Sequence, residues 1–344
     1  MLDAIVVGGG PAGAACALWA HQMGLRVLLL EAGPALGGLQ RRSPYENRWL
    51  PGKPGRTGQQ VAADLQAHLE QARVPFRLAW PVTGCRPLPG SSGWQVLGGD
   101  GEASEPVDGS GVSERGVKTC PSQAQSAAVA RATASICNAA RARFGVTSGH
   151  VGSVHRFSAR CLVLATGSRP RSGGFRESDR VGIGPGLSME RLEVAGRRVA
   201  ILGGGDNAFD QAFFALGRGA REVDVYCRRP PHAQALLQAR IDPARVHVGP
   251  FQAEQDRMMV DGRAVDVLGV QFGFEAVVPP GLSLPMRGGY VEVDRAGEVP
   301  GLPGLFAAGE MTNYWHPCVA TACAHGIQVA KSVQARVAAT APGA

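Results

Sequence analysis

Two glycine-rich turns, each followed by a charged residue, are the first candidates for chemistry. The first reads Gly8-x-Gly10-x-x-Gly13 between an apolar run and an Ala-rich stretch, and Glu31 ends the next apolar run. Glycines at this spacing permit a tight turn, close approach of the backbone to a pyrophosphate, and close helix–strand packing. A carboxylate in the place of Glu31 accepts hydrogen bonds from a ribose diol. An ordinary strand-to-helix turn is the alternative, but the full order of elements favours a dinucleotide site.

The second turn reads Gly203-x-Gly205-x-x-Ala208, with Asp206 and Asn207 inside it. The strand that follows its helix ends without a carboxylate, in the pair Arg228 and Arg229. A carboxylate there suits the ribose of NAD or FAD, whereas arginine suits the 2′-phosphate of NADP. A solvated pair in an arginine-rich chain is the alternative. We favour NADPH because both arginines stand at the discriminating position.

Two thiols and two imidazoles near the C-terminus are the remaining candidates. Cys318 and Cys323 precede or begin a helical stretch, and a thiolate at a helix N-terminus is stabilised. A redox role for Cys318 is therefore one interpretation, and inert packing is the other. His316 is a candidate for a hydrogen bond to a cofactor or for a helix cap, whereas His325 is interpreted as structural. None of the eight cysteines has CxxC or zinc-site spacing, so no metal site is predicted.

Strands and helices must position these residues. Apolar runs predict buried strands at 5–7, 27–31, 198–202 and 222–226, at 160–167, which ends in Ala-Thr-Gly, and at 302–310, which ends in Gly-Glu. Shorter strand-like pieces lie at 76–79 and 94–97. Helical periodicity or Ala-rich composition predicts helices at 14–23, 57–72, 208–217 and 319–337. The alternation of strands and helices around two glycine turns predicts an α/β protein with two Rossmann-like domains.

Two segments fall outside this alternation. Residues 98–150 are rich in Gly, Ser, Ala and scattered charge, which predicts an insertion or mobile loop; only 123–144 has a helical composition. A second loop follows the first dinucleotide motif and contains Tyr45 and Trp49. Either ring is a candidate to lie against a flat cofactor, and we favour ordinary packing for both.

Length and composition limit the class of protein. The 344 residues are 44% hydrophobic and 18% charged, which suffices for two domains with sizeable cores. No apolar run approaches the ~20 residues of a membrane span, and no signal-peptide pattern opens the chain, so we expect a cytoplasmic protein. The net charge of +7 suits an acidic protein partner. Nucleic acid is disfavoured, because no basic stripe is interleaved with aromatics.

Two dinucleotide motifs, joined by Ala165-Thr166-Gly167 and closed by Ala308-Gly309-Glu310, resemble the thioredoxin reductase-like family of flavoproteins. The resemblance covers nearly the whole chain except 98–150. It implies two Rossmann-like domains, with an NADPH-binding domain at 173–280 inserted in a discontinuous FAD-binding domain at 1–172 and 281–344. It also implies a homodimer.

The resemblance implies the roles of individual residues. FAD is expected on the first turn, with Glu31 on the adenosine ribose and Glu310, where the family usually has Asp, on the ribityl chain. The FAD-binding residues implied are Gly8, Gly10, Pro11, Ala12, Gly13, Glu31, Gly38, Ala165, Thr166, Gly167, Gly309, Glu310, Cys318, Val319 and Ala320. The NADPH-binding residues implied are Gly203, Gly205, Asp206, Asn207, Ala208, Arg228 and Arg229.

One departure from the family bears on the electron acceptor. Thioredoxin reductases carry a CxxC dithiol just before the second glycine turn, but residues 181–190 contain no cysteine. Without a dithiol, electrons cannot reach a protein disulfide by the usual exchange. Residues 271–275, followed by Gly281-Leu282, resemble the ferredoxin/flavodoxin–NADP reductase branch. That branch implies an FAD-dependent NAD(P)H oxidoreductase whose acceptor is ferredoxin or flavodoxin.

The chain also departs from that branch. Its C-terminal tail shows no obvious aromatic residue, and Gly-Gly-Leu-Gln at 37–40 stands in place of Gly-Gly-Gln. Three alternatives therefore stay open: a disulfide or low-molecular-weight thiol reductase using Cys318, an oxidase, and a non-catalytic flavin- or nucleotide-binding sensor. No catalytic residue is predicted beyond the candidates Cys318 and His316.

Overall fold

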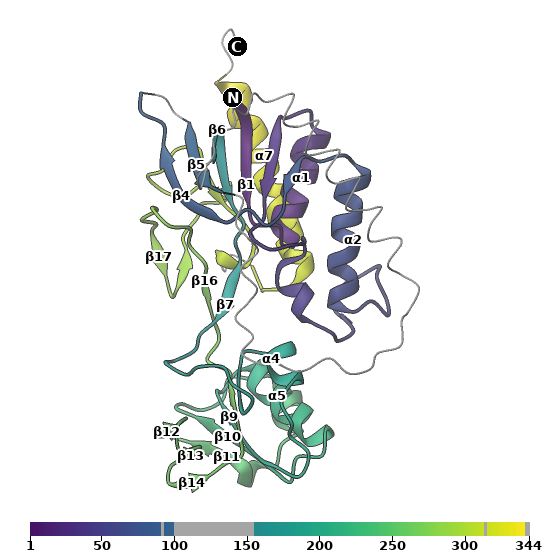
Figure 1. Ribbon diagram of the computed structural model, residues 1–344, viewed down its shortest axis with the longest axis vertical. Helices are drawn as coiled ribbons and strands as arrows, with labels where there is room; N and C mark the ends of the chain where they lie inside the picture. The colour runs from purple at the N-terminus through teal and green to yellow at the C-terminus, as the bar shows by residue number, and fades with distance from the viewer. Residues whose placement is uncertain (91–92, 100–154, 313–314, 341–344) are drawn as a thin grey trace.

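The computed structural model describes residues 1–90, 93–99, 155–312 and 315–340, and two sheets organise them (Figure 1). The larger sheet has the order β3-β2-β1-β6-β5-β4, with β19 also paired to β6. Its strands are β1 (Leu2–Val7), β2 (Val27–Leu30), β3 (Phe76–Arg77), β4 (Val82–Pro87), β5 (Trp94–Gly98), β6 (His155–Leu164) and β19 (Leu305–Ala307). All pairings are parallel except those of β4 and β5.

Three helices lie on one side of this sheet, as Figure 1 shows. They are α1 (Pro11–Gln22), α2 (Gly58–Gln71) and α7 (Val319–Ala339). Alternate residues of the strands face opposite ways, so Val6 and Val163 pack with the helices. Ile5 and Leu162 instead pack with Trp80 and Trp94 in a second core. We call this part of the protein the large unit.

The smaller sheet has five parallel strands in the order β11-β10-β9-β15-β8. They are β8 (Val181–Ile183), β9 (Arg198–Leu202), β10 (Glu222–Cys227), β11 (Val246–Val248) and β15 (Val267–Val270). Its helices are α4 (Leu187–Glu190), α5 (Asp206–Gly217) and α6 (Ala235–Gln238), and a meander of β12 (Ala253–Glu254), β13 (Met259–Val260) and β14 (Arg263–Ala264) accompanies them. We call this part the small unit.

The chain passes between the two units twice. β7 (Ser168–Pro170) leaves the large unit and pairs antiparallel with β16 (Phe274–Ala276), which returns to it. The hairpin of β17 (Met286–Arg287) and β18 (Tyr290–Val291) follows, and the chain then closes the large sheet at β19. In Figure 1 the units lie end to end with β7 between them. The small unit is thus inserted in the large one, which confirms the expected fold class; the exact domain boundaries stay predictions.

The sequence placed most elements but not all their ends. α1 begins at Pro11 rather than Ala14, because proline fits the first helical turn, where no N–H partner is needed. β4 is not predicted, since Val82–Pro87 mixes apolar, polar and proline residues and contains no apolar run. The predicted insertion at 98–150 and its helix at 123–144 lie almost wholly outside the described residues. No helix in the described part of the chain is long and apolar enough to cross a membrane.

A close helix crossing brings the end of the chain to the first glycine turn. A Cβ added to Gly326 of α7 would lie 2.1 Å from the carbonyl oxygen of Ala12 in α1. Only glycine permits this approach, so the N-terminal half of α7 lies directly beside the start of α1.

Candidate cofactor-binding site

The three glycines of the first turn have different structural roles. Gly8 has a φ of +102°, and a Cβ there would lie 2.4 Å from the carbonyl oxygen of Ala165. A Cβ on Gly13 would lie 1.9 Å from the carbonyl oxygen of Gly8. Gly10 is open instead, because its nearest neighbour would be the Cα of Gly38 at 3.9 Å. Gly8 and Gly13 therefore shape the turn, and Gly10 leaves room beside it.

That room is a cavity of about 250 Å³ at the N-terminus of α1. Most of the residues expected to bind FAD line it: Gly8, Gly10, Pro11, Ala12, Glu31, Gly38, Ala165, Thr166, Gly167, Gly309, Glu310, Cys318 and Val319. Gly13 and Ala320 are not among its lining residues. Sequence reasoning missed others: Gly9, Leu39, Gln40, Arg42, Ser168, Ala308 and Ala322. Of these, Ala308 belongs to the Ala308-Gly309-Glu310 motif and Ser168 directly follows the Ala165-Thr166-Gly167 motif.

Glu31 is held in place by backbone donors. Its Oε2 accepts the N–H of Gly9 at 2.6 Å, and its Oε1 accepts the N–H of Gly33 at 2.7 Å. Each carboxylate oxygen can accept a second hydrogen bond. Because Glu31 also lines the cavity, it retains acceptor capacity suited to the hydroxyls of a ribose.

Glu310 lies where two cavities meet. It follows β19 in a 3-10 helix, Gly309–Met311, and lines both the cavity at α1 and a larger one described below. Burial raises the pKa of its carboxyl group, and the hydrogen bond that Ser168 Oγ donates at 3.1 Å acts in the opposite direction. A buried acceptor of this kind suits a polyhydroxyl chain that donates hydrogen bonds.

The N-terminus of α7 is capped by Cys318, whose Sγ accepts the N–H of Thr321 at 3.5 Å. The capping alternative for His316 is therefore wrong: its side chain is exposed, and its carbonyl oxygen accepts from the Thr321 hydroxyl. Burial raises the pKa of Cys323, whose Sγ lies 3.6 Å from the carbonyl oxygen of Pro11. Of these side chains, only Cys318 lines the cavity at α1.

His325 contacts the backbone of Gly309, which lines the cavity at α1. Its side chain is buried, and Nδ1 accepts the N–H of Gly309 at 3.2 Å. Burial lowers the pKa of this imidazole to about 4. The ring is thus neutral near pH 7, as an acceptor at Nδ1 requires.

This imidazole makes the stability of the fold pH-dependent. Because its pKa lies below the ordinary value, the unfolded chain takes up the proton first as pH falls below about 6.5. We expect this group alone to remove about 2 kcal/mol of unfolding free energy by pH 5. His325→Asn, which cannot titrate, should flatten the dependence. Urea unfolding at pH 7 and pH 5 measures it, with the exposed His68→Asn as control. An unchanged slope in His325→Asn would contradict the assignment.

The second glycine turn resembles the first at its first glycine. Gly203 has a φ of +148°, and a Cβ there would lie 2.3 Å from the carbonyl oxygen of Gln271. Gly205 is the N-cap of α5, and Ala208 is fully buried beneath it. Asp206 accepts the backbone N–H of Gln234 at 2.8 Å, which secures the loop after β10. No side chain caps α5, so its first N–H groups can bind a phosphate, and a Cβ on Gly205 would lie 3.0 Å from Nε2 of His232.

Arg228 and Arg229 follow β10 and are both exposed. The guanidinium carbon of Arg228 lies 5.4 Å from the ring centre of Phe251 and 5.6 Å from that of Phe272. No ion pair is recorded for either arginine within the described ranges. Other arginines of the small unit do pair with carboxylates: Arg176, Arg191, Arg198, Arg245, Arg257 and Arg263. The donors of the Arg228 pair thus remain open to an anion.

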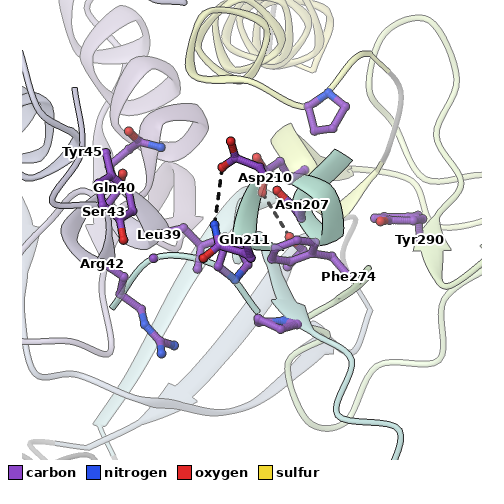
Figure 2. Close-up of a pocket in the computed structure, with 16 residues that line it drawn as sticks. Leu39, Gln40, Arg42, Ser43, Tyr45, Asn207, Asp210, Gln211, Phe274 and Tyr290 are labelled. Carbon is purple, nitrogen blue, oxygen red and sulfur yellow. Dashed lines mark hydrogen bonds between the residues drawn. The ribbon is translucent and has the colours of Figure 1, made fainter. Parts of the chain in front are cut away.

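A cavity of about 350 Å³ lies between the units (Figure 2). The large unit contributes Leu39, Gln40, Arg42, Ser43, Tyr45, Ser168, Tyr290 and Glu310, and the small unit contributes Pro185, Gly186, Asn207, Asp210 and Gln211, among others. Because Gln40, Arg42, Ser168 and Glu310 also line the cavity at α1, the two cavities adjoin. The start of α5 therefore faces the Glu310 end of the first cavity.

Two acceptors on α5 face this space. Burial raises the pKa of Asp210, and Gln211 Nε2 lies 3.5 Å from its carboxylate, as the dashed line in Figure 2 shows. Gln211 Oε1 is buried and has no hydrogen-bond partner among the described residues. Such an oxygen suits a ligand that donates N–H.

The structure also shows where Tyr45, Trp49 and the cysteine-free segment 181–190 lie. Tyr45 packs on Phe214 with ring centres 5.6 Å apart, whereas Trp49 is 83% exposed, so packing was the wrong expectation for Trp49. The segment at 181–190 contains β8 and α4 and borders the cavity through Pro185 and Gly186. In the described part of the chain, no three His, Cys, Asp or Glu side chains are grouped to hold a metal.

Known proteins resemble this chain over most of its length. The family model for pyridine nucleotide-disulphide oxidoreductases matches residues 2–335. A ferredoxin–NADP reductase of Limosilactobacillus fermentum is 26% identical over 340 residues, which cover 91% of this chain and 86% of that protein. A thioredoxin reductase of Streptomyces coelicolor is 25% identical over 364 residues, covering 98% and 94%.

A solved structure shares the fold. The crystal structure of Lactococcus lactis thioredoxin reductase in its FR conformation matches with a TM-score of 0.69 at 17% identity, covering 98% of this chain and 100% of that one. The chain uses FAD and NADPH as an NAD(P)H-dependent flavoprotein oxidoreductase. Because the family model spans nearly the whole chain, the protein belongs to the pyridine nucleotide-disulphide oxidoreductase family.

Proposed function

We propose that this protein passes electrons from NADPH through FAD to a small acidic electron-carrier protein such as ferredoxin or flavodoxin. The observation that carries the proposal is the shared cavity: Asn207 of the second glycine turn and Glu310 of the cavity at α1 both line it, and the segment 181–190, which borders it through Pro185 and Gly186, has no cysteine. When bound, NADPH supplies a hydride and FAD accepts it and releases electrons singly. The protein's part is to bind, orient and shield the two cofactors.

FAD is proposed to occupy the cavity at α1. Gly10 and the N-terminal N–H groups of α1 would bind its pyrophosphate, since the backbone there is open and the helix dipole favours anions. Glu31 would accept from the adenosine ribose, and Glu310 from the ribityl chain. The N-terminus of α7, capped by Cys318, would face the flavin ring.

NADPH is proposed to lie along the start of α5. Arg228 and Arg229 would bind the 2′-phosphate, and Gly205 would face the pyrophosphate. Asp210 and Gln211 would then stand at the nicotinamide end, where their acceptor oxygens suit the N–H₂ of the carboxamide. The nicotinamide end of NADPH would then face Glu310, which would contact FAD.

The distribution of charge supports an acidic carrier docked on the large unit. Residues 1–99 hold nine Arg and Lys against five Asp and Glu, and residues 155–172 hold four Arg and no acid. Residues 173–280 hold 13 basic against 14 acidic residues. The positive excess therefore belongs to the FAD-binding side, from which electrons would leave. The ferredoxin–NADP reductases among the relatives point to the same acceptor class.

One loop of the large unit combines a net positive charge with an exposed aromatic ring, which are features suited to docking an acidic carrier. Residues 46–56 follow Tyr45, which lines the shared cavity, and carry Arg48, Lys53 and Arg56 near Trp49 in sequence. Glu46 pairs with Arg48, and Asp64 of α2 is shared by Lys53 and Arg56, so a net positive charge remains. An exposed ring among cations suits a partner with acidic groups around an apolar spot.

The double variant Arg48→Glu/Lys53→Glu is expected to raise the KM for ferredoxin about tenfold at low salt, because steering of an acidic carrier is electrostatic. Reduction of ferricyanide by NADPH should stay unchanged, since it needs no protein docking. Arg257→Glu, on the small unit, is the matched control. The difference from wild type should shrink as ionic strength rises. A salt-independent KM equal to that of wild type would exclude this docking surface.

An anaerobic acceptor screen tests the proposal as a whole. NADPH should bleach the bound flavin, and ferredoxin or flavodoxin should restore its colour. If NADPH bleaches the flavin of the wild-type enzyme but the enzyme reduces neither carrier, the proposal is wrong. Turnover of disulfides that Cys318→Ser abolishes would replace it with the thiol reductase, because Cys318 lines the cavity at α1. The homodimer stays a prediction, which light scattering on the purified protein tests.

A further inference from the structure

A short segment of the large unit contacts the small unit beside the shared cavity. Tyr45 Oη donates a hydrogen bond to Glu190 Oε2 at 2.5 Å, and Arg42 Nη2 donates to Ser188 Oγ at 2.9 Å. Ser188 and Glu190 both belong to α4. We call these two hydrogen bonds the 42–45 contact. It joins groups more than 140 residues apart in sequence.

The contact reaches α5 as well as α4. The ring of Tyr45 meets that of Phe214 edge-on, with centres 5.6 Å apart and planes at 67°. Arg218, which caps the end of α5, donates a hydrogen bond to the carbonyl oxygen of Glu190. Tyr45 thus touches the helix that begins at the second glycine turn, and Glu190 is tied to the end of that helix.

The two backbones also approach closely here. A Cβ on Gly186, just before α4, would lie 2.6 Å from the carbonyl oxygen of Arg42. Gly186 has a φ of +77°, which L side chains rarely adopt. Burial raises the pKa of the Tyr45 phenol, and the Glu190 carboxylate adds to this, so the phenol keeps its proton and donates near neutral pH. The contact is therefore both packed and charge-assisted.

The position of α5 follows from this contact. Phe214 and Arg218 lie at one end of the helix, and Asn207, Asp210 and Gln211 at the other end line the shared cavity. A helix of 12 residues is a stiff element, so fixing one end fixes what the other end faces. What it faces is the Glu310 end of the cavity at α1. The chain passes between the two units at β7 and β16, and each of these strands has only three residues.

We infer that Tyr45 and Glu190 are positioning residues for the NADPH half-reaction. They hold the small unit in the orientation in which the start of α5 faces the FAD cavity, so this orientation is the one that transfers hydride. The enzyme then needs no rotation of its units to bring the cofactors together. The inference rests on the use of FAD and NADPH and is independent of which carrier accepts the electrons.

Stopped-flow reduction of the holoenzyme by NADPH without oxygen measures this role. Tyr45→Phe removes the hydrogen bond but keeps the ring, and Glu190→Gln removes the charge. Each is expected to lower the limiting rate of flavin bleaching roughly threefold to tenfold, because a hydrogen bond to a charged group is lost. The NADPH dissociation constant and the FAD content should not change. The double variant should be no slower than the slower single variant, since both remove one interaction.

Glu193→Gln is the matched control. Its carboxylate is exposed, lies three residues from Glu190, and accepts only the nearby N–H of Ala195 among the recorded bonds of the described chain. This variant should reduce its flavin at the wild-type rate.

A second readout needs no cofactor. In the apoprotein, amides of 41–46 and 186–191 should exchange hydrogen faster in Tyr45→Phe than in wild type, because both segments lose their mutual contact. Amides of β1, in the core of the large unit, should not change.

Three results would overturn the inference. A limiting rate equal to or above that of wild type in both variants would show that this orientation is not the productive one. A weaker NADPH affinity with an unchanged limiting rate would assign the residues to binding instead. Additive effects in the double variant would mean that Tyr45 and Glu190 act separately.

Discussion

Gly10→Ala is expected to lose FAD while the apoprotein stays folded, and Gly13→Ala is expected to disrupt the fold itself. Gly10 has a φ of −69° and a ψ of −179°, which any L residue adopts, and a Cβ there meets nothing closer than 3.9 Å. The added methyl group instead occupies the room proposed for the pyrophosphate. We expect the dissociation constant for FAD to rise at least about 100-fold, or about 3 kcal/mol.

Gly13 behaves differently because its surroundings are protein. A Cβ there would lie 1.9 Å from the carbonyl oxygen of Gly8 and 3.1 Å from the side chain of Ala165. Helix α1 would have to move away from β1, which opens the core on which α7 also packs. Overpacking at a site that cannot relax costs about 3 kcal/mol or more.

Circular dichroism and flavin titration separate the two outcomes. Gly10→Ala should show wild-type helix content and a wild-type apoprotein melting temperature but no quenching of added FAD fluorescence. Gly217→Ala is the control, because a Cβ at the end of α5 meets nothing within 4 Å. Yellow Gly10→Ala protein with wild-type affinity would place FAD elsewhere.

The features that the sequence predicted well are local ones. A strand, a glycine turn and a helix are contiguous, so Gly8, Gly10 and Gly13 could be assigned separate tasks before their neighbours were known. The same holds for the apolar strands, whose period and burial are properties of a few adjacent residues. The second turn gave Gly203 and Gly205 in the same way.

The remaining features depend on the packing of distant segments. The partner of Tyr45 lies 145 residues away, and no periodicity in the loop after Gly38 points to it. Gln211 reads as one more polar residue on a helix, and only the fold shows that its oxygen is buried without a partner. His325 was interpreted as structural from its place in the helix, but its bond to Gly309 required the crossing of α7 over α1.

The largest expected effect on nucleotide choice comes from Arg228 and Arg229. Replacing both by alanine should lower kcat/KM for NADPH about 100-fold, because charge-assisted hydrogen bonds to the 2′-phosphate are lost. Activity with NADH should change little, since NADH has no phosphate at that position. The ion pairs of the small unit support this prediction. No carboxylate among the described residues pairs with Arg228 or Arg229, although the small unit holds 14 acidic residues.

The aromatic neighbours of Arg228 give the argument a second test. Phe251 and Phe272 each lie within 6 Å of its guanidinium carbon, a distance at which ring faces attract a cation. Phe251→Leu keeps an apolar side chain but removes that ring, so Arg228 should lose part of its fixed position. We expect a loss of about threefold in kcat/KM for NADPH and none for NADH.

Steady-state rates with both nucleotides and ferricyanide measure the two effects. Arg221→Ala, an exposed arginine before the same strand, is the control and should leave the NADPH to NADH ratio as it is. If the double arginine variant weakens both nucleotides equally, the pair serves general attraction rather than recognition of the 2′-phosphate. Single variants separate the two arginines. If only Arg229→Ala lowers kcat/KM for NADPH, then Phe251 and Phe272 hold Arg228 away from the nucleotide.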